Sequence, residues 1–326
     1  VKAGADNMGG GRRMIKSKKL LIAVDGSPHS LKAVSYVALN YAAVKPRINL
    51  MYVISTAPQA FWDFEKGGFF KRKMRAKYIE WKKNEEQAAE AFLDEAKQLI
   101  LQANFREEEI NIIHRERLAG IARDIISESS EGYDALVLGR RGSSKMEDLF
   151  PGSVSYKIAQ GVEHTPVWVI GGDIRLRKML LAVDGSENCR RAVDYVGTFA
   201  AAAGAEVTLF SVVRDFKLQL LDVSTPRGEE IENKLLEEVE RDICSMFDSY
   251  RKRLEQAGVK GTRISIKHKL RSQTRAGDIL EEASKGNYGA LIIGRRGLSA
   301  IQELPLGQVA TKVLHRAKGT AVWIVP

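Results

Sequence analysis

Two glycine-rich segments contain the residues of this chain whose types and spacing could bind an anion. The segment 139–142 reads Gly-Arg-Arg-Gly, follows the apolar run 135–138, and precedes Gly152 and Ser153 by nine residues. Glycine permits turns with positive φ and lets backbone N–H groups approach a ligand, and a helix N-terminus adds partial positive charge. The spacing therefore predicts a loop and a helix start that wrap a phosphate group.

A matching segment lies 155 residues further along the chain. Residues 294–297 also read Gly-Arg-Arg-Gly, follow the apolar run 290–293, and precede Gly307 and Gln308 at the same spacing. Turns after strands use glycine routinely, so one such segment alone would be a weak signal. The repeat at equal spacing makes coincidence a poor explanation and favours the phosphate interpretation.

The other side chains of these segments leave two questions open. Arg140 and Arg141 could neutralise phosphate, or they could point to solvent as side chains between turn glycines often do. Ser153 could cap the following helix or donate its hydroxyl to phosphate, whereas Gln308 is longer and a poorer cap. The first copy is therefore the better candidate for a competent site.

A carboxylate follows the first strand of each copy, at Asp25 and Asp184. It could cap the next helix, but Ser27 and Ser186 are good N-cap candidates themselves, and Pro28 suits the first helical position. A carboxylate beside a phosphate loop would repel phosphate. We therefore interpret Asp25 as an acceptor of hydrogen bonds from ribose hydroxyls or an adenine amino group.

The chain is an internal duplication, as a search for repeats shows. Residues 20–27 match 179–186 at six of eight positions, and residues 133–144 match 288–299 at eight of twelve. A length of 326 residues also suits two domains. We predict these parts: a flexible basic tail over 1–17, a first domain over 18–171 and a second domain over 172–326.

Each copy alternates strand and helix, which is typical of a doubly wound parallel sheet. The predicted strands cover 19–24, 48–54, 110–116, 134–138, 167–170, 178–183, 206–212, 263–269, 290–293 and 321–325. The predicted helices cover 28–44, 71–103, 120–131, 154–161, 187–203, 228–257, 276–286 and 308–317. The strands are continuous apolar runs, so helices should cover both faces of the sheet. Ligands of such sheets bind at the carboxyl ends of the strands, where Asp25 and Gly139 both fall.

Composition limits the partners of the chain. Of the net charge of +10, the first 19 residues supply +5, and residues 20–170 hold 20 basic and 20 acidic residues. Nucleic acid is therefore an unlikely partner, and no apolar run is long enough to span a membrane. No apolar stretch precedes Leu20 as a secretory signal would require, and two cysteines make no disulfide framework. We expect a cytoplasmic protein.

Signatures of a dedicated enzyme are missing from the sequence. No Cys/His cluster has zinc spacing, and neither a Gly-x-Ser-x-Gly elbow nor a Walker-type P-loop occurs. Slow, metal-assisted hydrolysis stays open. Trp168 and Trp323 are interpreted as core or interface residues. The aromatic stretch 57–70 could be a lid or a partner-binding surface, although a loop covering the sheet edge explains it better.

The quoted residues resemble those of the universal stress proteins. Val-Asp-Gly-Ser at 24–27, the glycine spacing over 139–153 and Thr-Pro-Val-Trp-Val at 165–169 all match the ATP-binding branch of that family. The resemblance covers nearly the whole chain twice, so the chain looks like a tandem member. It implies five-stranded parallel sheets of order 3-2-1-4-5 that pair inside the chain through their last strands, Val167–Ile170 against Ala321–Val325.

The resemblance also implies the ligand and its contacts. It assigns adenine nucleotide (ATP, or AMP and ADP) to Asp25, Val53, Gly139, Gly142, Gly152, Ser153 and Val154. It assigns no metal ligands to the protein, because Mg²⁺ or Mn²⁺ would be carried on the phosphates. The matching second-copy residues are Asp184, Val212, Gly294, Gly297, Gly307 and Val309, and Gln308 departs from the Ser, Thr or Asn usual there.

The function expected on these grounds is that of an ATP-binding stress-response protein that acts as a nucleotide-dependent sensor or regulator. Two rivals remain: a hydrolase-like enzyme that turns ATP over slowly, and a protein-interaction module without nucleotide. The sequence does not name the stress or a regulatory partner, and it leaves open whether two chains associate into a homodimer.

Overall fold

The computed structural model describes residues 18–55, 68–141, 151–172, 175–214, 226–297 and 305–326. Three sequence predictions lie outside this part of the chain: the basic tail over 1–17, most of the aromatic stretch 57–70, and the contribution of Gly142 to the phosphate loop.

The described residues contain the strands and helices that the sequence predicts, with boundaries that differ by at most three residues. The first half contains β1 (Lys19–Val24), α1 (Pro28–Tyr41), β2 (Arg47–Ile54), α3 (Gly68–Gln102), β3 (Ile110–Glu116), α4 (Ile121–Ser129), β4 (Ala135–Gly139), α5 (Ser153–Gly161) and β5 (Val167–Ile170). The second half contains β6 (Lys178–Val183), α6 (Glu187–Ala203), β7 (Glu206–Arg214), α7 (Pro226–Gln256), β8 (Ile264–Ser272), α8 (Arg275–Lys285), β9 (Ala290–Gly294), α9 (Gln308–Arg316) and β10 (Ala321–Val325).

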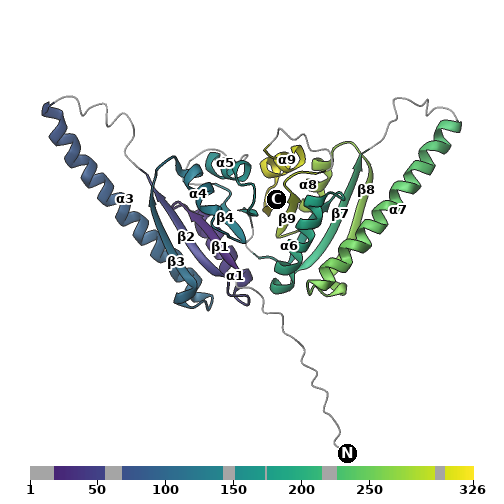
Figure 1. Cartoon of the computed structure of the whole chain (residues 1–326), viewed down its shortest axis with the longest axis horizontal. Helices are drawn as coiled ribbons and strands as arrows, with labels where there is room; N and C mark the ends of the chain where they lie inside the picture. The colour runs from purple at the N-terminus through teal and green to yellow at the C-terminus, as the bar shows by residue number, and fades with distance from the viewer. Residues whose placement is uncertain (1–17, 56–67, 142–150, 173–174, 215–225, 298–304) are drawn as a thin grey trace, which may run out of the picture.

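All ten strands form one continuous sheet in the order β3-β2-β1-β4-β5-β10-β9-β6-β7-β8 (Figure 1). Each half keeps the expected order 3-2-1-4-5, and its strand pairs are parallel. The halves meet where β5 and β10 pair antiparallel, with Trp168 opposite Trp323. The prediction of two doubly wound parallel sheets joined through their last strands is confirmed.

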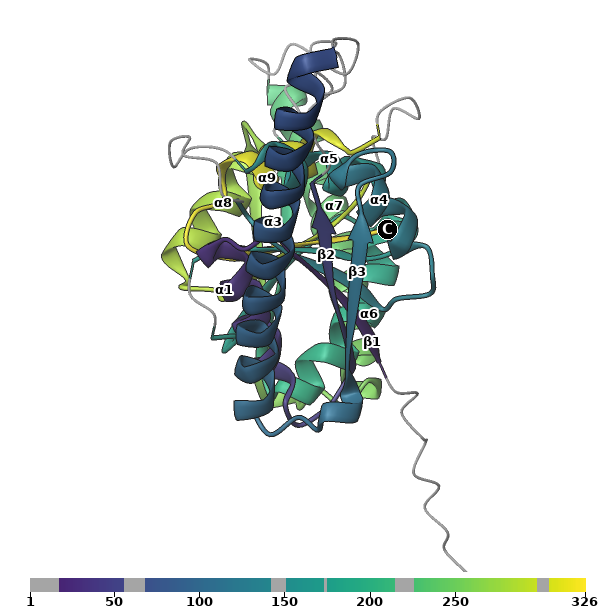
Figure 2. The same ribbon diagram turned by 90° about the vertical axis from the view of Figure 1, so that its left-hand side faces the viewer.

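Helices cover both faces of this sheet, as the continuous apolar strands predicted. One buried cluster lies between the sheet and α1, α3, α6 and α7, and a second lies between the sheet and α4, α5, α8 and α9. Figure 2 shows α3 running lengthwise beside β2 and β3 on one outer side of the molecule. Both clusters combine residues of the two halves, so the core is shared across the domain boundary.

The indole rings of Trp168 and Trp323 form the centre of that boundary. Their centroids lie 4.0 Å apart with planes 6° from parallel, and both residues are fully buried. Trp168 also meets Phe199 of α6 edge-on at 4.9 Å and Tyr41 of α1 at 5.4 Å. The interpretation of both tryptophans as core or interface residues is confirmed.

The turn after the first strand of each half is built identically. Ser27 caps α1 by accepting a hydrogen bond from the Ser30 backbone N–H, and Ser186 caps α6 through Cys189 N–H. The glycine before each serine has a φ of 77° or 78°, which a residue with a side chain rarely adopts. Sequence and local geometry therefore agree at this turn.

Helix α4 begins at a glycine cap without a side chain, and Asp124 in its first turn supplies the missing acceptor. The Asp124 carboxylate accepts hydrogen bonds from Leu118 N–H and Ala119 N–H, both at 2.9 Å, and from Gly120 N–H at 3.4 Å. Burial raises the pKa of this carboxyl, but the three hydrogen bonds and nearby Arg115 outweigh burial and hold the pKa below its usual value.

We expect Asp124→Asn to lower the free energy of unfolding by about 1–3 kcal/mol at pH 7, because buried N–H donors lose a charged acceptor. Because the pKa of Asp124 is lower in the folded state than in the unfolded state, the ionised carboxylate stabilises the fold at pH values above the ordinary carboxyl pKa. This stabilisation is lost as the pH falls through the folded-state pKa. The gap between wild-type and variant should therefore shrink below about pH 4 in urea denaturation. Glu90→Gln, on the exposed face of α3, is the control. A gap independent of pH would contradict the assignment.

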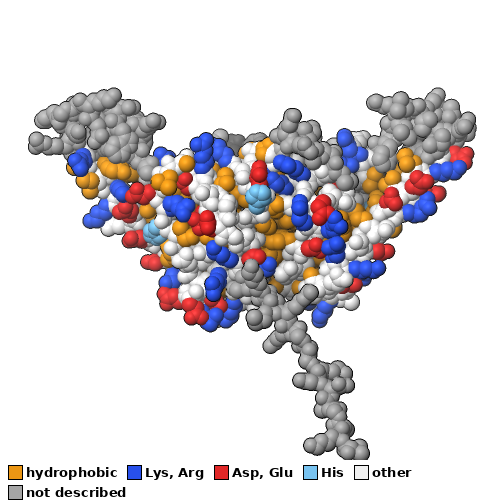
Figure 3. All heavy atoms as spheres, viewed as in Figure 1, with side chains coloured by type: hydrophobic (Ala, Val, Ile, Leu, Met, Phe, Trp, Pro, Cys, Tyr) orange, Lys and Arg blue, Asp and Glu red, His pale blue; other side chains and the backbone are white. Residues whose placement is uncertain are grey.

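The visible surface mixes Lys and Arg with Asp and Glu over both halves (Figure 3). Such interspersed charges are typical of solvated helix faces. Among the helices that the structure describes, none is long and apolar enough to cross a membrane.

Candidate functional site

The predicted site residues of the first domain that the structure describes lie at one edge of the sheet. Strand β1 is paired in parallel with β2 and with β4, so the carboxyl ends of the three strands are neighbours. Asp25 follows β1 and is exposed, Val53 lies near the end of β2 and is 7% exposed, and Gly139 ends β4. This edge includes the switch point between β1 and β4, where open parallel sheets bind ligands.

One carboxylate oxygen of Asp25 already accepts hydrogen bonds within the protein. Its Oδ1 accepts from Ser27 N–H at 3.1 Å and from Ser27 Oγ at 2.6 Å, which orients the serine that caps α1. Within the described part of the chain, Oδ2 makes no hydrogen bond. One carboxylate oxygen therefore supports the fold, and the other can accept hydrogen bonds from a ligand.

The start of α5 is tied to the end of β4. Gly152 N–H donates to the Arg140 carbonyl at 2.8 Å, and Ser155 Oγ donates to the Gly139 carbonyl at 2.8 Å. A Cβ on Gly139 would lie 2.6 Å from the His29 carbonyl oxygen, so glycine lets β4 end against α1. Close packing against α1 is therefore a sufficient reason for glycine at position 139, as the approach of a ligand would be.

The N-terminal cap of α5 shows whether Ser153 caps this helix. Gly152 is the N-cap, with φ −58° and ψ 148°, and no side chain caps the helix. Ser153 is the first helical residue, and both Ser153 and Val154 are exposed. Ser153 is therefore not the cap, and its hydroxyl and the first N–H groups of α5 are available to an anion.

In the second domain, a single cavity of about 510 Å³ brings together every residue that the resemblance assigns to its site. The predicted residues that line it are Asp184, Val212, Gly294, Gly297, Gly307 and Val309, with Gln308 beside them. Gly307 caps α9 with φ −61° and ψ 152°, nearly the values of Gly152. Replacing serine by Gln308 therefore leaves the backbone of the helix start unchanged.

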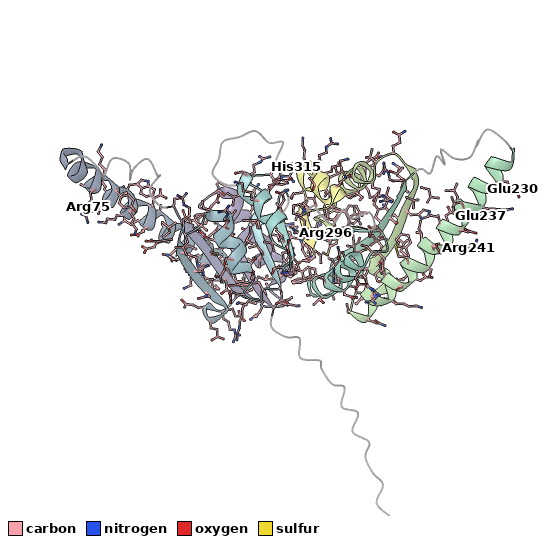
Figure 4. The ribbon with its side chains drawn as sticks, turned by 45° about the horizontal axis from the view of Figure 1, so that its top comes forward. Arg75, Glu230, Glu237, Arg241, Arg296 and His315 are labelled. Carbon is pink, nitrogen blue, oxygen red and sulfur yellow. The ribbon has the colours of Figure 1, made fainter. Side chains whose placement is uncertain are left out.

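Sequence reasoning missed the positive charge of this cavity. Five basic residues are among the described residues that line it, against one acidic residue, Asp184. The basic residues are Arg214, Arg275, Arg295, Arg296 and Lys312. They come from β7, the start of α8, the loop after β9 and α9. Arg295 and Arg296 belong to the Gly-Arg-Arg-Gly segment, but nothing in the spacing of Arg214, Arg275 and Lys312 along the chain indicated that they share its site. Figure 4 shows Arg296 near the middle of the molecule.

Cys189 also lines this cavity and is 2% exposed. Burial raises the pKa of its thiol to about 11, so the thiol is protonated at neutral pH and is a poor nucleophile. In the described residues, no group of three or more His, Cys, Asp or Glu side chains could hold a metal ion. Apart from Arg295, whose guanidinium donates to carbonyls of α5, the basic residues of the cavity offer hydrogen-bond donors and positive charge, which suit binding of an anion.

Comparison with known proteins identifies one family along the chain. The family model for the universal stress protein family matches residues 16–171 and again residues 175–326. Universal stress protein YxiE of Bacillus subtilis (strain 168) is 26% identical over 141 residues, which cover 42% of this chain and 90% of that protein.

Two crystal structures share the fold over nearly the whole chain. A universal stress protein from Archaeoglobus fulgidus DSM 4304 superposes with a TM-score of 0.60 at 20% identity, covering 95% of this chain and 98% of its own. A putative universal stress protein from Pseudomonas aeruginosa UCBPP-PA14 gives a TM-score of 0.57 at 14% identity, covering 94% and 92%. With the family model matched once in each half, this chain belongs to the universal stress protein family as a tandem member.

Proposed function

We propose that the protein binds ATP at the carboxyl edge of its first domain and acts as a nucleotide-dependent regulator in a stress response. The observation that carries the proposal is the second-domain cavity, which gathers the aspartate, the glycines and the helix start in one place. Its volume falls within the roughly 300–1,000 Å³ usual for small-molecule sites. The first domain repeats the helix cap and the turn at the aspartate.

In the first domain, Asp25 would hold the adenosine. Its Oδ2 can accept from the ribose hydroxyls or the adenine amino group, and Val53 offers apolar contact beside it. The backbone around Gly139, Gly142, Gly152 and Val154 and the Ser153 hydroxyl would hold the ribose and phosphates, with the Gly152 N–H kept by the Arg140 carbonyl. Magnesium or manganese would be carried on the phosphates.

In the second domain, the same backbone and an excess of basic residues support nucleotide binding that is weaker than in the first. Gln308 there lacks the short hydroxyl of Ser153. A regulatory role is preferred over catalysis because the described residues of the cavity provide charge and hydrogen-bond donors, which suit binding of an anion. We place this regulator in the cytoplasm.

Denaturing the purified protein and assaying the released nucleotide tests the proposal directly. We expect adenine nucleotide in the supernatant, or ATP binding by calorimetry after the protein has been stripped. Neither released nucleotide nor calorimetric binding of ATP, ADP or AMP would overturn the proposed function. Turnover of bound ATP that disappears in Asp25→Ala would favour the enzymatic rival.

Exchanging Ser153 and Gln308 should reverse the preference between the two domains. A hydrogen bond to a charged group contributes about 1.5–3 kcal/mol, which corresponds to roughly a 10- to 100-fold change in affinity. We expect Ser153→Gln to lose about that factor in calorimetric ATP titrations, and the double variant Ser153→Gln with Gln308→Ser to regain binding. Unchanged affinity in Ser153→Gln would show that the backbone alone holds the phosphates.

A further inference from the structure

The first arginine of each Gly-Arg-Arg-Gly segment reaches across the domain boundary. The sequence analysis had offered only phosphate or solvent as the surroundings of Arg140. Arg295 of the second domain donates from Nη1 to the carbonyls of Ala159 (3.0 Å) and Val162 (2.5 Å), and from Nη2 to the carbonyl of Gln160. These three carbonyls belong to the last turn and C-cap of α5 in the first domain. The Arg295 residue is 4% exposed.

The matching arginine of the first domain, Arg140, likewise donates to the end of a helix in the second domain. Arg140 of the first domain donates from Nη2 to the carbonyl of His315 at 2.9 Å, in the last turn of α9. Figure 4 shows His315 at the junction of the two halves. Each helix therefore begins at the candidate site of its own domain and ends on an arginine supplied by the other domain.

Both ends of α5 are thus fixed, but by different domains. Its first turn is held by Gly152 N–H on the Arg140 carbonyl, and its last turn is held by the Arg295 guanidinium. The last carbonyls of a helix have no partner within the helix, and a cation there complements the helix dipole. A helix of only nine residues has little stability of its own. Its orientation therefore depends on these two anchors.

Arg295 is itself anchored to its own domain. Its N–H donates to the Val325 carbonyl at 2.6 Å, and its carbonyl accepts from Gly307 N–H at 3.0 Å. Its guanidinium cannot touch a ligand at the start of α5, because nine residues span about 13 Å at 1.5 Å per residue. Any effect of Arg295 on that ligand must pass through α5.

We propose that Arg295, a residue of the second domain, is a positioning residue for the nucleotide site of the first domain. This inference rests on the proposed function. Arg295 satisfies the last carbonyls of α5 and so holds the N–H groups at the other end of the helix in the direction of the phosphates. The first site is then complete only when both domains are present, which gives a tandem chain a reason to keep a second domain that binds nucleotide weakly.

The test measures ATP affinity in the full chain with the second site silenced by Asp184→Ala. In this parent we expect Arg295→Met to lose about five- to tenfold in affinity, at the low end of couplings between distant sites, which are roughly 5- to 150-fold. Arg295→Lys should recover part of the loss, because it restores the charge and one donor. Amide hydrogen exchange in α5 without ligand should be faster in Arg295→Met and partly restored in Arg295→Lys.

Two controls separate positioning from general weakening of the protein. Tyr195→Phe removes another bond across the boundary, from Tyr195 Oη to the Asp134 carbonyl at 3.0 Å, without touching α5. Arg253→Met removes an arginine of the second domain that pairs with Asp194 instead. We expect both to keep the parent's affinity for ATP and its exchange rates in α5.

The outcomes are distinct. Equal ATP affinity and equal α5 exchange in the parent and Arg295→Met would overturn the positioning role, and so would an equal loss of affinity in Tyr195→Phe. No ATP binding by the parent, with binding also absent from wild-type, would overturn the proposed function instead. The exchange measurement alone would then decide whether Arg295 holds α5.

Discussion

Trp168→Ala is expected to cost about 3–5 kcal/mol in the free energy of unfolding, the range for removing a large buried aromatic side chain. Trp168 is fully buried and stacks on Trp323 at 4.0 Å, where the two halves of the sheet join. Aromatic pairs add about 0.5–1.5 kcal/mol beyond their buried area. Urea denaturation followed by circular dichroism measures the loss.

A matched control exists on the outer helix α3. Trp81 is partly exposed and stacks on Tyr78 at 5.9 Å, away from the domain boundary. We expect Trp81→Ala to change stability by about 0.5 kcal/mol, as surface substitutions do. Similar losses in Trp81→Ala and Trp168→Ala would contradict the view that the stacked tryptophans hold the two domains together.

Asp25→Ala is expected to weaken ATP binding about 10- to 100-fold, because a charged acceptor of the adenosine is lost and such hydrogen bonds contribute about 1.5–3 kcal/mol. Calorimetry on stripped protein gives the affinity. Asp184→Ala, the same change in the second domain, should leave the tightest binding close to wild-type.

Part of any loss in Asp25→Ala could come from the turn, because Asp25 also orients Ser27. Ser27→Ala removes the cap of α1 but keeps the carboxylate, so it measures the contribution of the turn alone. We expect it to bind ATP nearly as wild-type does. Equal losses in Ser27→Ala and Asp25→Ala would assign Asp25 to the fold rather than to the ligand.

The sequence predicted best those features that depend only on residues close together along the chain. The Ser27 cap, the positive φ of Gly26 and the apolar strands depend on residues that are neighbours along the chain. Because the carboxyl ends of parallel strands lie at the same edge of a sheet, the sequence also predicted that Asp25 and Gly139 are neighbours. The joining of β5 to β10 came from the family resemblance and not from the residues themselves.

By itself, therefore, the sequence determined the duplicated strands and helices, the parallel sheets and the edge that holds the candidate site. Only the tertiary structure decided that Gly152 caps α5 and that five basic residues line a cavity with Asp184. It alone also decided that the Arg295 guanidinium binds the end of α5 in the other domain. The reason is physical. Turns and strands follow from the few residues around them, whereas the contacts of a long arginine side chain depend on which distant segments the fold brings within its reach.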